Sequence, residues 1–150
     1  MGRKCAAFLL TILFVLSVMN TAELSMGIKL AKDVKLPEGT YDEYVADAEN
    51  QQIRLVLTTD AVITNVKVLG LEIKEVDNTG KPFFSEAVLY TQGKLTPKRP
   101  LVLNLTFLGD IPNYGVSYIE ENGSVKRYAI GQSGEDGSLL LTEYRPASGS

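Results

Sequence analysis

LVLNLTFL, residues 101–108, carries the clearest strand pattern in the chain. Its apolar side chains alternate along the chain, so that one face of an extended strand would carry Leu101, Leu103, Leu105 and Phe107. The opposite face carries two polar residues, Asn104 and Thr106. One buried face and one partly wet face are typical of antiparallel sheets, so these residues predict an antiparallel strand at the edge of a hydrophobic core.

Similar alternation recurs from Gln52 onward, in short segments separated by turn residues. The predicted strands are 53–57, 61–76, 83–90, 101–108, 116–120, 125–130 and 139–144. No long helical period follows residue 50. We therefore predict an all-β domain over residues 51–145, an antiparallel β-sandwich of immunoglobulin-like type with about seven strands, with a small β-barrel as the alternative.

The segment 61–76 contains a change of face. Val66 and Val68 share one parity, and Leu71 and Ile73 share the other. A regular strand keeps its apolar residues on one face, and Gly70 stands at the change. A β-bulge or sharp bend is expected there.

Two further segments flank the predicted sandwich. Residues 28–50 form a lead-in for which the pattern leaves two interpretations open. Thr40 and Glu43 have the spacing of a capping box, which favours a short helix, but a loose polar segment fits as well. Residues 146–150 have the composition of a flexible tail.

The N-terminus has the pattern of a secretory signal peptide over residues 1–27. Arg3 and Lys4 precede the apolar run AAFLLTILFVLSV, residues 6–18, which is shorter than the roughly 20 residues needed to span a bilayer. Cleavage could follow Ala22, which has Asn20 at the −3 position, or Gly27, which with Ser25 at −3 fits the small-residue pattern better. An uncleaved anchor is the alternative. The sequence thus predicts a protein that is secreted, periplasmic or part of the cell envelope, without membrane insertion after cleavage.

Charge and cysteine content exclude several partners and chemistries. The net charge is −3, and loss of Arg3 and Lys4 would make it −5, which disfavours nucleic acid and anionic lipid. Cys5 is the single cysteine and precedes the apolar run, so the exported chain would be cysteine-free, without disulfides or thiolate chemistry. An exported domain without cysteine favours a bacterial origin.

The chain also lacks histidine, which removes the Ser-His-Asp triad and the usual zinc ligands. Neither Gly-Lys pair continues as a P-loop, and Ser133 lies in a motif that departs from the nucleophile elbow. We therefore expect no cofactor, no metal and no enzymatic activity. A hydrolase built on two carboxylates is the least implausible enzymatic alternative.

Two loops are candidate binding sites. GQSGEDGS, residues 131–138, offers Glu135 and Asp136 for a cation or ligand, but a tight turn between two strands explains it more simply. GDIPNYG, residues 109–115, places Asp110, Asn113 and Tyr114 together in a short loop. The sequence leaves open whether the two loops share one end of the sandwich.

Asn122-Gly123 predicts a hairpin whose arms carry Tyr118 and Tyr128. A three-residue loop would align Tyr118 with Lys126 and place both tyrosines on one face, whereas a two-residue loop would separate them. One shared face would form an aromatic and basic surface suited to a glycan or peptide, although ordinary cross-strand pairing is the simpler explanation.

LTPKRPLV, residues 95–102, holds Lys98-Arg99 between two prolines. A protease inhibitor could present such a dipeptide, and a stiffened connection between strands is the simpler interpretation. The function that best fits the whole sequence is a non-enzymatic binding or interaction module whose ligand is a protein or a glycan. Its candidate ligand-binding residues are Asp110, Asn113, Tyr114, Tyr118, Glu135 and Asp136.

Overall fold

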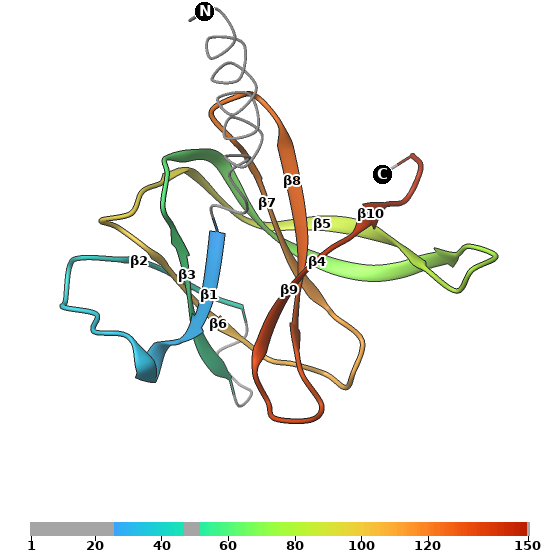
Figure 1. Ribbon diagram of the computed structural model, residues 1–150, viewed down its shortest axis with the longest axis horizontal. Coiled ribbons are helices and arrows are strands. Elements are labelled where there is room, and N and C mark those ends of the chain that lie inside the picture. Colours follow the sequence, from blue (N-terminus) through green and yellow to red (C-terminus); the bar gives the residue numbers. More distant parts are fainter. Residues whose placement is uncertain (1–25, 47–51, 150) are drawn as a thin grey trace, which may run out of the picture.

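The computed structural model describes residues 26–46 and 52–149. These residues form ten strands and one short 3-10 turn, with no α-helix among them. The strands make a four-stranded and a six-stranded sheet (Figure 1). The predicted β-sandwich is confirmed, with ten strands instead of about seven, and the larger sheet curls into a half-barrel. The immunoglobulin-like relationship stays a prediction.

The smaller sheet has the strand order β1-β3-β6-β2. Its strands are β1 (Met26–Leu30), β2 (Asp42–Val45), β3 (Ile53–Thr59) and β6 (Leu101–Leu105). β3 pairs antiparallel with β1 and with β6, whereas β2 runs parallel to β6. The 3-10 turn η1 (Ala31–Asp33) follows β1 directly.

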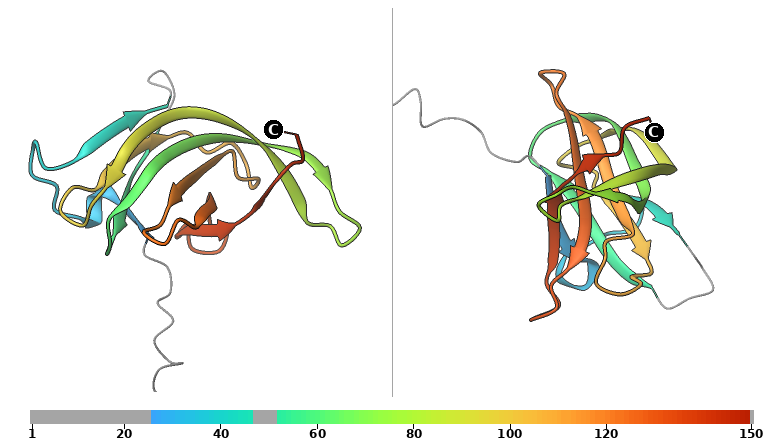
Figure 2. Two further views of the ribbon diagram at one scale, coloured as in Figure 1. Left: turned by 90° about the horizontal axis from the view of Figure 1, so that it is seen from above. Right: turned by 90° about the vertical axis from the view of Figure 1, so that its right-hand side faces the viewer.

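The larger sheet has the order β10-β5-β4-β7-β8-β9. Its strands are β4 (Ile63–Val76), β5 (Pro82–Leu95), β7 (Tyr114–Ile119), β8 (Val125–Gln132), β9 (Leu139–Glu143) and β10 (Arg145–Pro146). Figure 2 shows β4 and β5 as a long curved ribbon that extends beyond the rest of the molecule. The last two strands follow each other in sequence but lie at opposite edges of the sheet, so the chain crosses from one edge to the other near Tyr144.

The main core lies between the two sheets. Leu101, Leu103 and Leu105 of β6 are fully buried in it, as their alternation predicted. Val102 is also fully buried, because the segment 31–41 covers the outer face of the smaller sheet. The strand ends at Leu105, earlier than predicted, and Leu108 is 70% exposed.

The predicted helix in the lead-in segment is wrong, and so is the loose alternative. Thr40 closes a turn by donating its hydroxyl to the carbonyl of Pro37, 2.6 Å away. Glu43 lies in β2, where its carboxylate accepts hydrogen bonds from Arg54 and Asn104. β1 and β2 are part of the smaller sheet, so the sandwich begins at Met26. Pairing with distant strands decided the structure of this segment, and local spacing could not reveal it.

The predicted irregularity near Gly70 is confirmed, displaced by one residue. The register between β4 and β5 shifts between Val68 and Leu69, where β5 carries the extra residue Leu89. Two further register shifts occur in β4, one between Ile73 and Glu75 and one that coincides with Asn65, which has a φ of 49°. The apolar residues of β4 also change from one face to the other because both faces of this strand are buried, one in the main core and one in a second cluster.

The C-terminal segment is also more ordered than predicted. Pro146 belongs to β10, and Ala147 is 5% exposed. The amide of Ala147 donates to the carbonyl of Phe84 at 2.8 Å. The flexible-tail prediction is therefore wrong for these two residues, which are fastened to β5.

Candidate functional site

The two candidate loops lie at the same end of the six-stranded sheet. Tyr114, the first residue of β7, pairs with Ile130 near the end of β8, so the loops before β7 and after β8 leave the sheet together. Figure 1 shows them side by side at the lower edge of the molecule. Shared position alone does not make a binding site, because a site also requires side chains that are free to contact a ligand.

Glu135 and Asp136 occupy an exposed turn closed by its own hydrogen bonds. The amide of Gly137, with a φ of 73°, donates to the carbonyl of Ser133 at 2.9 Å. The carboxylate of Asp136 accepts the amide of Ser138 at 2.9 Å. Hydrogen bonds from Ser138 lower the pKa of Asp136, and this aspartate therefore acts as a turn-closing residue.

In the other loop, Asn113 and Tyr114 have structural contacts. The side-chain amide of Asn113 donates to the carbonyl of Thr106, and its backbone carbonyl accepts the amide of Leu71. Tyr114 packs edge-to-face on Phe107, with ring centroids 6.4 Å apart, against the main core. Asp110 is exposed. This loop therefore has a fixed base, and of the three candidate residues Asp110 alone faces solvent freely.

Tyr118 belongs to the core and not to a recognition surface. It aligns with Lys126, as the three-residue loop predicted, and shares a face with Tyr128. The two rings stack at 6.2 Å, and Tyr118 is 1% exposed. The shared face points into the sandwich, so these tyrosines are not available to a ligand.

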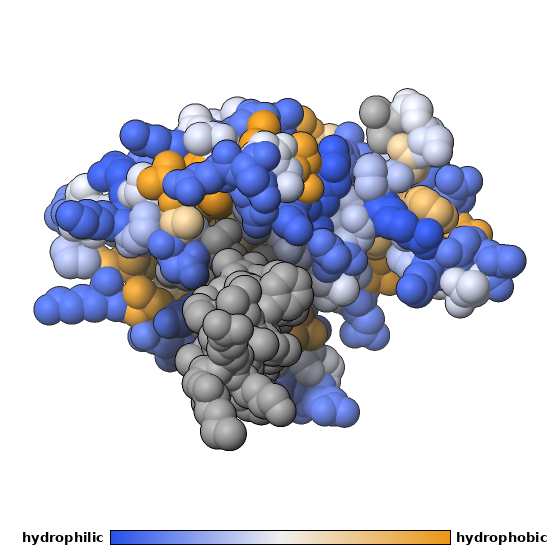
Figure 3. Space-filling model, turned by 45° about the horizontal axis from the view of Figure 1, so that its top comes forward, coloured by the Kyte–Doolittle hydropathy of each residue, from blue (hydrophilic) through white to orange (hydrophobic). Residues whose placement is uncertain are grey.

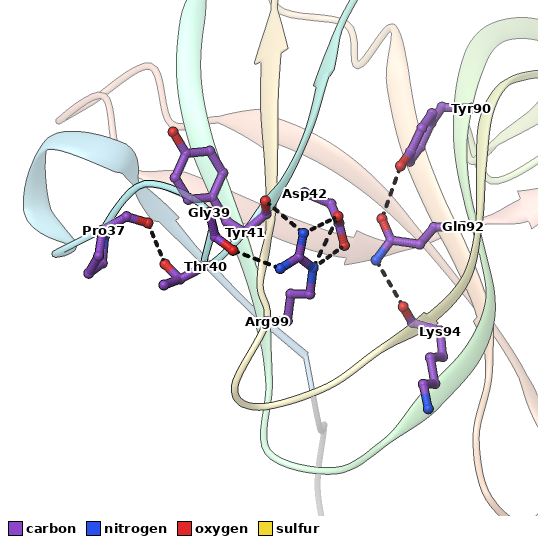
Figure 4. Close-up of polar contacts among 9 residues, drawn as sticks. All are labelled: Pro37, Gly39, Thr40, Tyr41, Asp42, Tyr90, Gln92, Lys94 and Arg99. Carbon is purple, nitrogen blue, oxygen red and sulfur yellow. Dashed lines mark hydrogen bonds and ion pairs between the residues drawn. The ribbon is translucent and has the colours of Figure 1, made fainter.

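Arg99 is occupied by contacts within the protein (Figure 4). Its guanidinium donates to both carboxylate oxygens of Asp42 at 2.9–3.1 Å and to the carbonyls of Gly39 and Tyr41. These contacts raise the pKa of Arg99 and fasten the turn after β5 to the start of β2. Such a residue is poorly placed to enter the specificity pocket of a protease.

A groove of about 720 Å³ lies on the face of the larger sheet that points away from the smaller sheet. The C-terminal chain crosses this face between β9 and β10, and the groove follows that crossing. Its lining residues come from β5, β8, β9, β10 and three connections between strands: Lys81, Pro82, Phe84, Pro112, Val125, Arg127, Ala129, Thr142, Glu143, Tyr144, Arg145 and Pro146. None of the candidate residues chosen from the sequence lines it.

The floor of this groove is apolar. Phe84, Ala129, Leu69 and Leu71 form the second buried cluster, and Tyr144 packs against it. The rings of Phe84 and Tyr144 meet edge-to-face with centroids 5.5 Å apart. These contacts hold the crossing segment against the sheet and so shape the groove.

Beneath the crossing segment lies a polar network centred on Glu86. One carboxylate oxygen accepts the hydroxyl of Tyr144 at 2.5 Å and the Nε of Arg127 at 3.0 Å. The Glu86 side chain is 19% exposed, so its charge requires these partners. Burial and the hydrogen bond to Glu86 raise the pKa of Tyr144, so the phenol stays protonated to a higher pH than an ordinary tyrosine does.

The rim of the groove is fixed by a second charged group. Arg145 donates to the carboxylate of Asp77 at 2.7 Å, and its guanidinium lies 4.1 Å from the ring centroid of Phe83. Asp77 also accepts from Thr79 and Lys81 in the turn between β4 and β5. Hydrogen bonds from Thr79 and Arg145 hold its pKa well below the usual range.

Exposed apolar side chains occur in the groove lining and in a loop that contributes to it. Val125 lines it and is 52% exposed, and Leu108 and Ile111, 70% and 59% exposed, belong to the same loop as the lining residue Pro112. Figure 3 shows that apolar residues on the pictured face form separate patches among hydrophilic ones.

The groove cannot be recognised in the sequence, because its lining residues come from four separated segments, 81–84, 112, 125–129 and 142–146. Glu86 shares a strand face with Phe84, and such a charge beside a buried ring signals a partner elsewhere. Nothing in the spacing identifies that partner as Arg127 or Tyr144.

Within residues 26–46 and 52–149, no group of three or more acidic side chains could hold a metal ion. No helix in the same residues is long and apolar enough to cross a membrane. Comparison of the chain with protein-family models, characterised proteins and solved structures gives no match.

Proposed function

We propose that this chain is an exported, non-enzymatic binding module that holds an extended apolar segment of a partner protein in the groove beside Tyr144. The observation that carries the proposal is the groove itself, about 720 Å³ with an apolar floor and a few fixed polar groups. Clefts of this size and character are typical ligand sites. Export follows from the predicted signal peptide.

The lining favours a protein segment over a glycan. Phe84 is 4% exposed and Tyr144 meets it edge-on, so neither ring offers an open platform for stacking a sugar. Half of the lining residues are apolar, including Val125 and three prolines. Both arginines are already paired, Arg127 with Glu86 and Arg145 with Asp77, so the groove does not select for an anionic ligand.

The alternatives receive less support. Among the carboxyl groups of the described chain, each clear pKa shift is downward, at Glu43, Asp77 and Asp136, which does not suit the general acid of a hydrolase. The inhibitor hypothesis requires a free Arg99, whereas this side chain is held by Asp42.

A binding survey tests the proposal. The chain is expressed in full and purified after any signal-peptide processing by the host cell. Its binding to a displayed library of random linear peptides and to a glycan array is then measured in parallel. Thr142→Arg places a large charged side chain in the groove, and Thr64→Arg makes the same change at an exposed position of β4 outside it. Thermal melts of both variants control for folding.

We expect selected peptides to carry apolar residues in an extended pattern. Their affinity should fall at least about tenfold with Thr142→Arg and stay unchanged with Thr64→Arg. Glycan binding without peptide binding would overturn the choice of ligand. Absence of both, or equal loss in both variants, would overturn the groove as the site.

A further inference from the structure

The outer edge of β5 is open over most of its length. The strand runs from Pro82 to Leu95 and pairs with β4 along one side. On the other side, β10 pairs with Phe83 and Phe84 only. In the part of the chain that the structure describes, the remaining residues, 85–95, have no neighbouring strand on that side.

This edge differs from the other sheet edges. The outer strands β1, β2, β9 and β10 have at most five residues each, which is one way in which proteins protect an edge. The open run of β5 has eleven residues and contains no proline. It also exposes two apolar side chains, Val88 at 57% and Leu89 at 41%. A long, apolar, unprotected edge is a site for strand addition.

The charges on this run fit a second copy of itself. Glu86 and Lys94 are its two charged residues, and each lies four positions from Tyr90. Antiparallel pairing of two such runs about a two-fold axis at Tyr90 sets Glu86 of each copy opposite Lys94 of the other. Because one Glu86 oxygen already accepts from Tyr144 and Arg127 of its own chain, Lys94 of the other copy would add a further cation to this carboxylate, and like charges never meet directly in this register.

The ends of the run agree with the same arrangement. At one end β10 covers Phe84, and at the other the chain turns away through Thr96–Arg99, where the amide of Arg99 donates to the carbonyl of Thr96. In the two-fold pair, Thr96 of one copy would come opposite Phe84 of the other. Each strand therefore turns away where it would meet the β10 of its partner. The bulge at Leu89 lies next to the axis, so both strands bend at the same level.

We infer that two copies of this chain associate through antiparallel pairing of residues 85–95, joining their six-stranded sheets into one continuous sheet. This inference does not depend on the groove or its ligand.

Light scattering of the full processed chain over a range of concentrations tests it. Lys94→Glu would set two carboxylates opposite each other across the edge, and Val88→Lys would place a charged side chain opposite Gln92 in the middle of the paired run. The matched controls are Lys94→Arg, which keeps the charge, and Leu140→Lys, which changes an apolar side chain of β9 that is 47% exposed.

We expect a dimer whose dissociation constant rises about tenfold in both edge variants, because each altered pair occurs twice across the axis. Both controls should leave the constant unchanged. A monomer at the highest concentration would overturn the inference, and so would a dimer that both edge variants leave intact.

Discussion

Gly115 and Gly131 offer the sharpest test of how the larger sheet is packed. Both lie in strands, β7 and β8, and neither has a positive φ. An added Cβ at Gly115 would stand 2.9 Å from Cδ1 of Leu71 and 3.0 Å from the backbone carbonyl oxygen of Tyr128. An added Cβ at Gly131 would meet nothing within 4 Å.

The same change to alanine should therefore have opposite effects at the two positions. The carbonyl of Tyr128 cannot withdraw without breaking the ladder, and Leu71 is buried, so Gly115→Ala should cost about 1–3 kcal/mol. Gly131→Ala should be neutral or add about 0.4–1 kcal/mol, since it reduces the freedom of the unfolded chain. The expected difference between the two variants is about 1–4 kcal/mol.

Urea unfolding measures this difference, with the slope of the transition as a check that both variants unfold the same structure. A thermal melt should separate the midpoints by several degrees. If Gly115→Ala is as stable as the parent chain, Leu71 does not pack against β7 as described. If Gly131→Ala loses as much stability as Gly115→Ala, the effect belongs to glycine in strands generally and not to this contact.

Three further predictions concern other parts of the molecule. Arg99→Ala should lower the thermal midpoint more than Lys98→Ala does, because Arg99 forms the ion pair with Asp42. Added salt should reduce the difference between the two midpoints, and equal midpoints without added salt would contradict the role of this contact. Tyr144→Phe should cost about 1.5–3 kcal/mol at neutral pH through loss of the hydrogen bond to Glu86. Because the folded pKa of Tyr144 is raised, that cost should shrink as the pH rises above about 10, where the unfolded phenol ionises, and a constant difference in urea titrations across this range would count against the network. Mass spectrometry of the secreted chain should find Glu23 at its N-terminus, since Met26 is 3% exposed and pairs with Thr59 in β1, and cleavage after Gly27 would remove it; an N-terminus at Ile28 would refute this choice.

Alternation of side chains predicted the sandwich well because it reflects burial directly. Leu101, Leu103 and Leu105 are buried as expected. The hairpin register that aligns Tyr118 with Lys126 is one of the two registers that the sequence allows. The prediction for the lead-in segment is wrong because Glu43 is held by Arg54 and Asn104, which are distant in sequence. Local spacing carries no information about such partners.

Three of the candidate binding residues have contacts within the protein, for a related reason. Asp136, Asn113 and Tyr118 belong to types that often bind ligands, but each satisfies its own turn, loop or core. The groove depends on the crossing of Tyr144 from one sheet edge to the other, and strand order cannot be obtained from one sequence. Only the curled sheet brings Tyr144 to Glu86.

The groove beside Tyr144 is proposed to receive an extended protein segment. The most direct measurement is the change in backbone amide NMR shifts of the labelled protein when a library-selected peptide is added. We expect the largest changes at Phe84, Ala129, Thr142 and Arg145, which line the groove. Largest changes in the loops 109–113 or 133–138, with the groove unaffected, would contradict it.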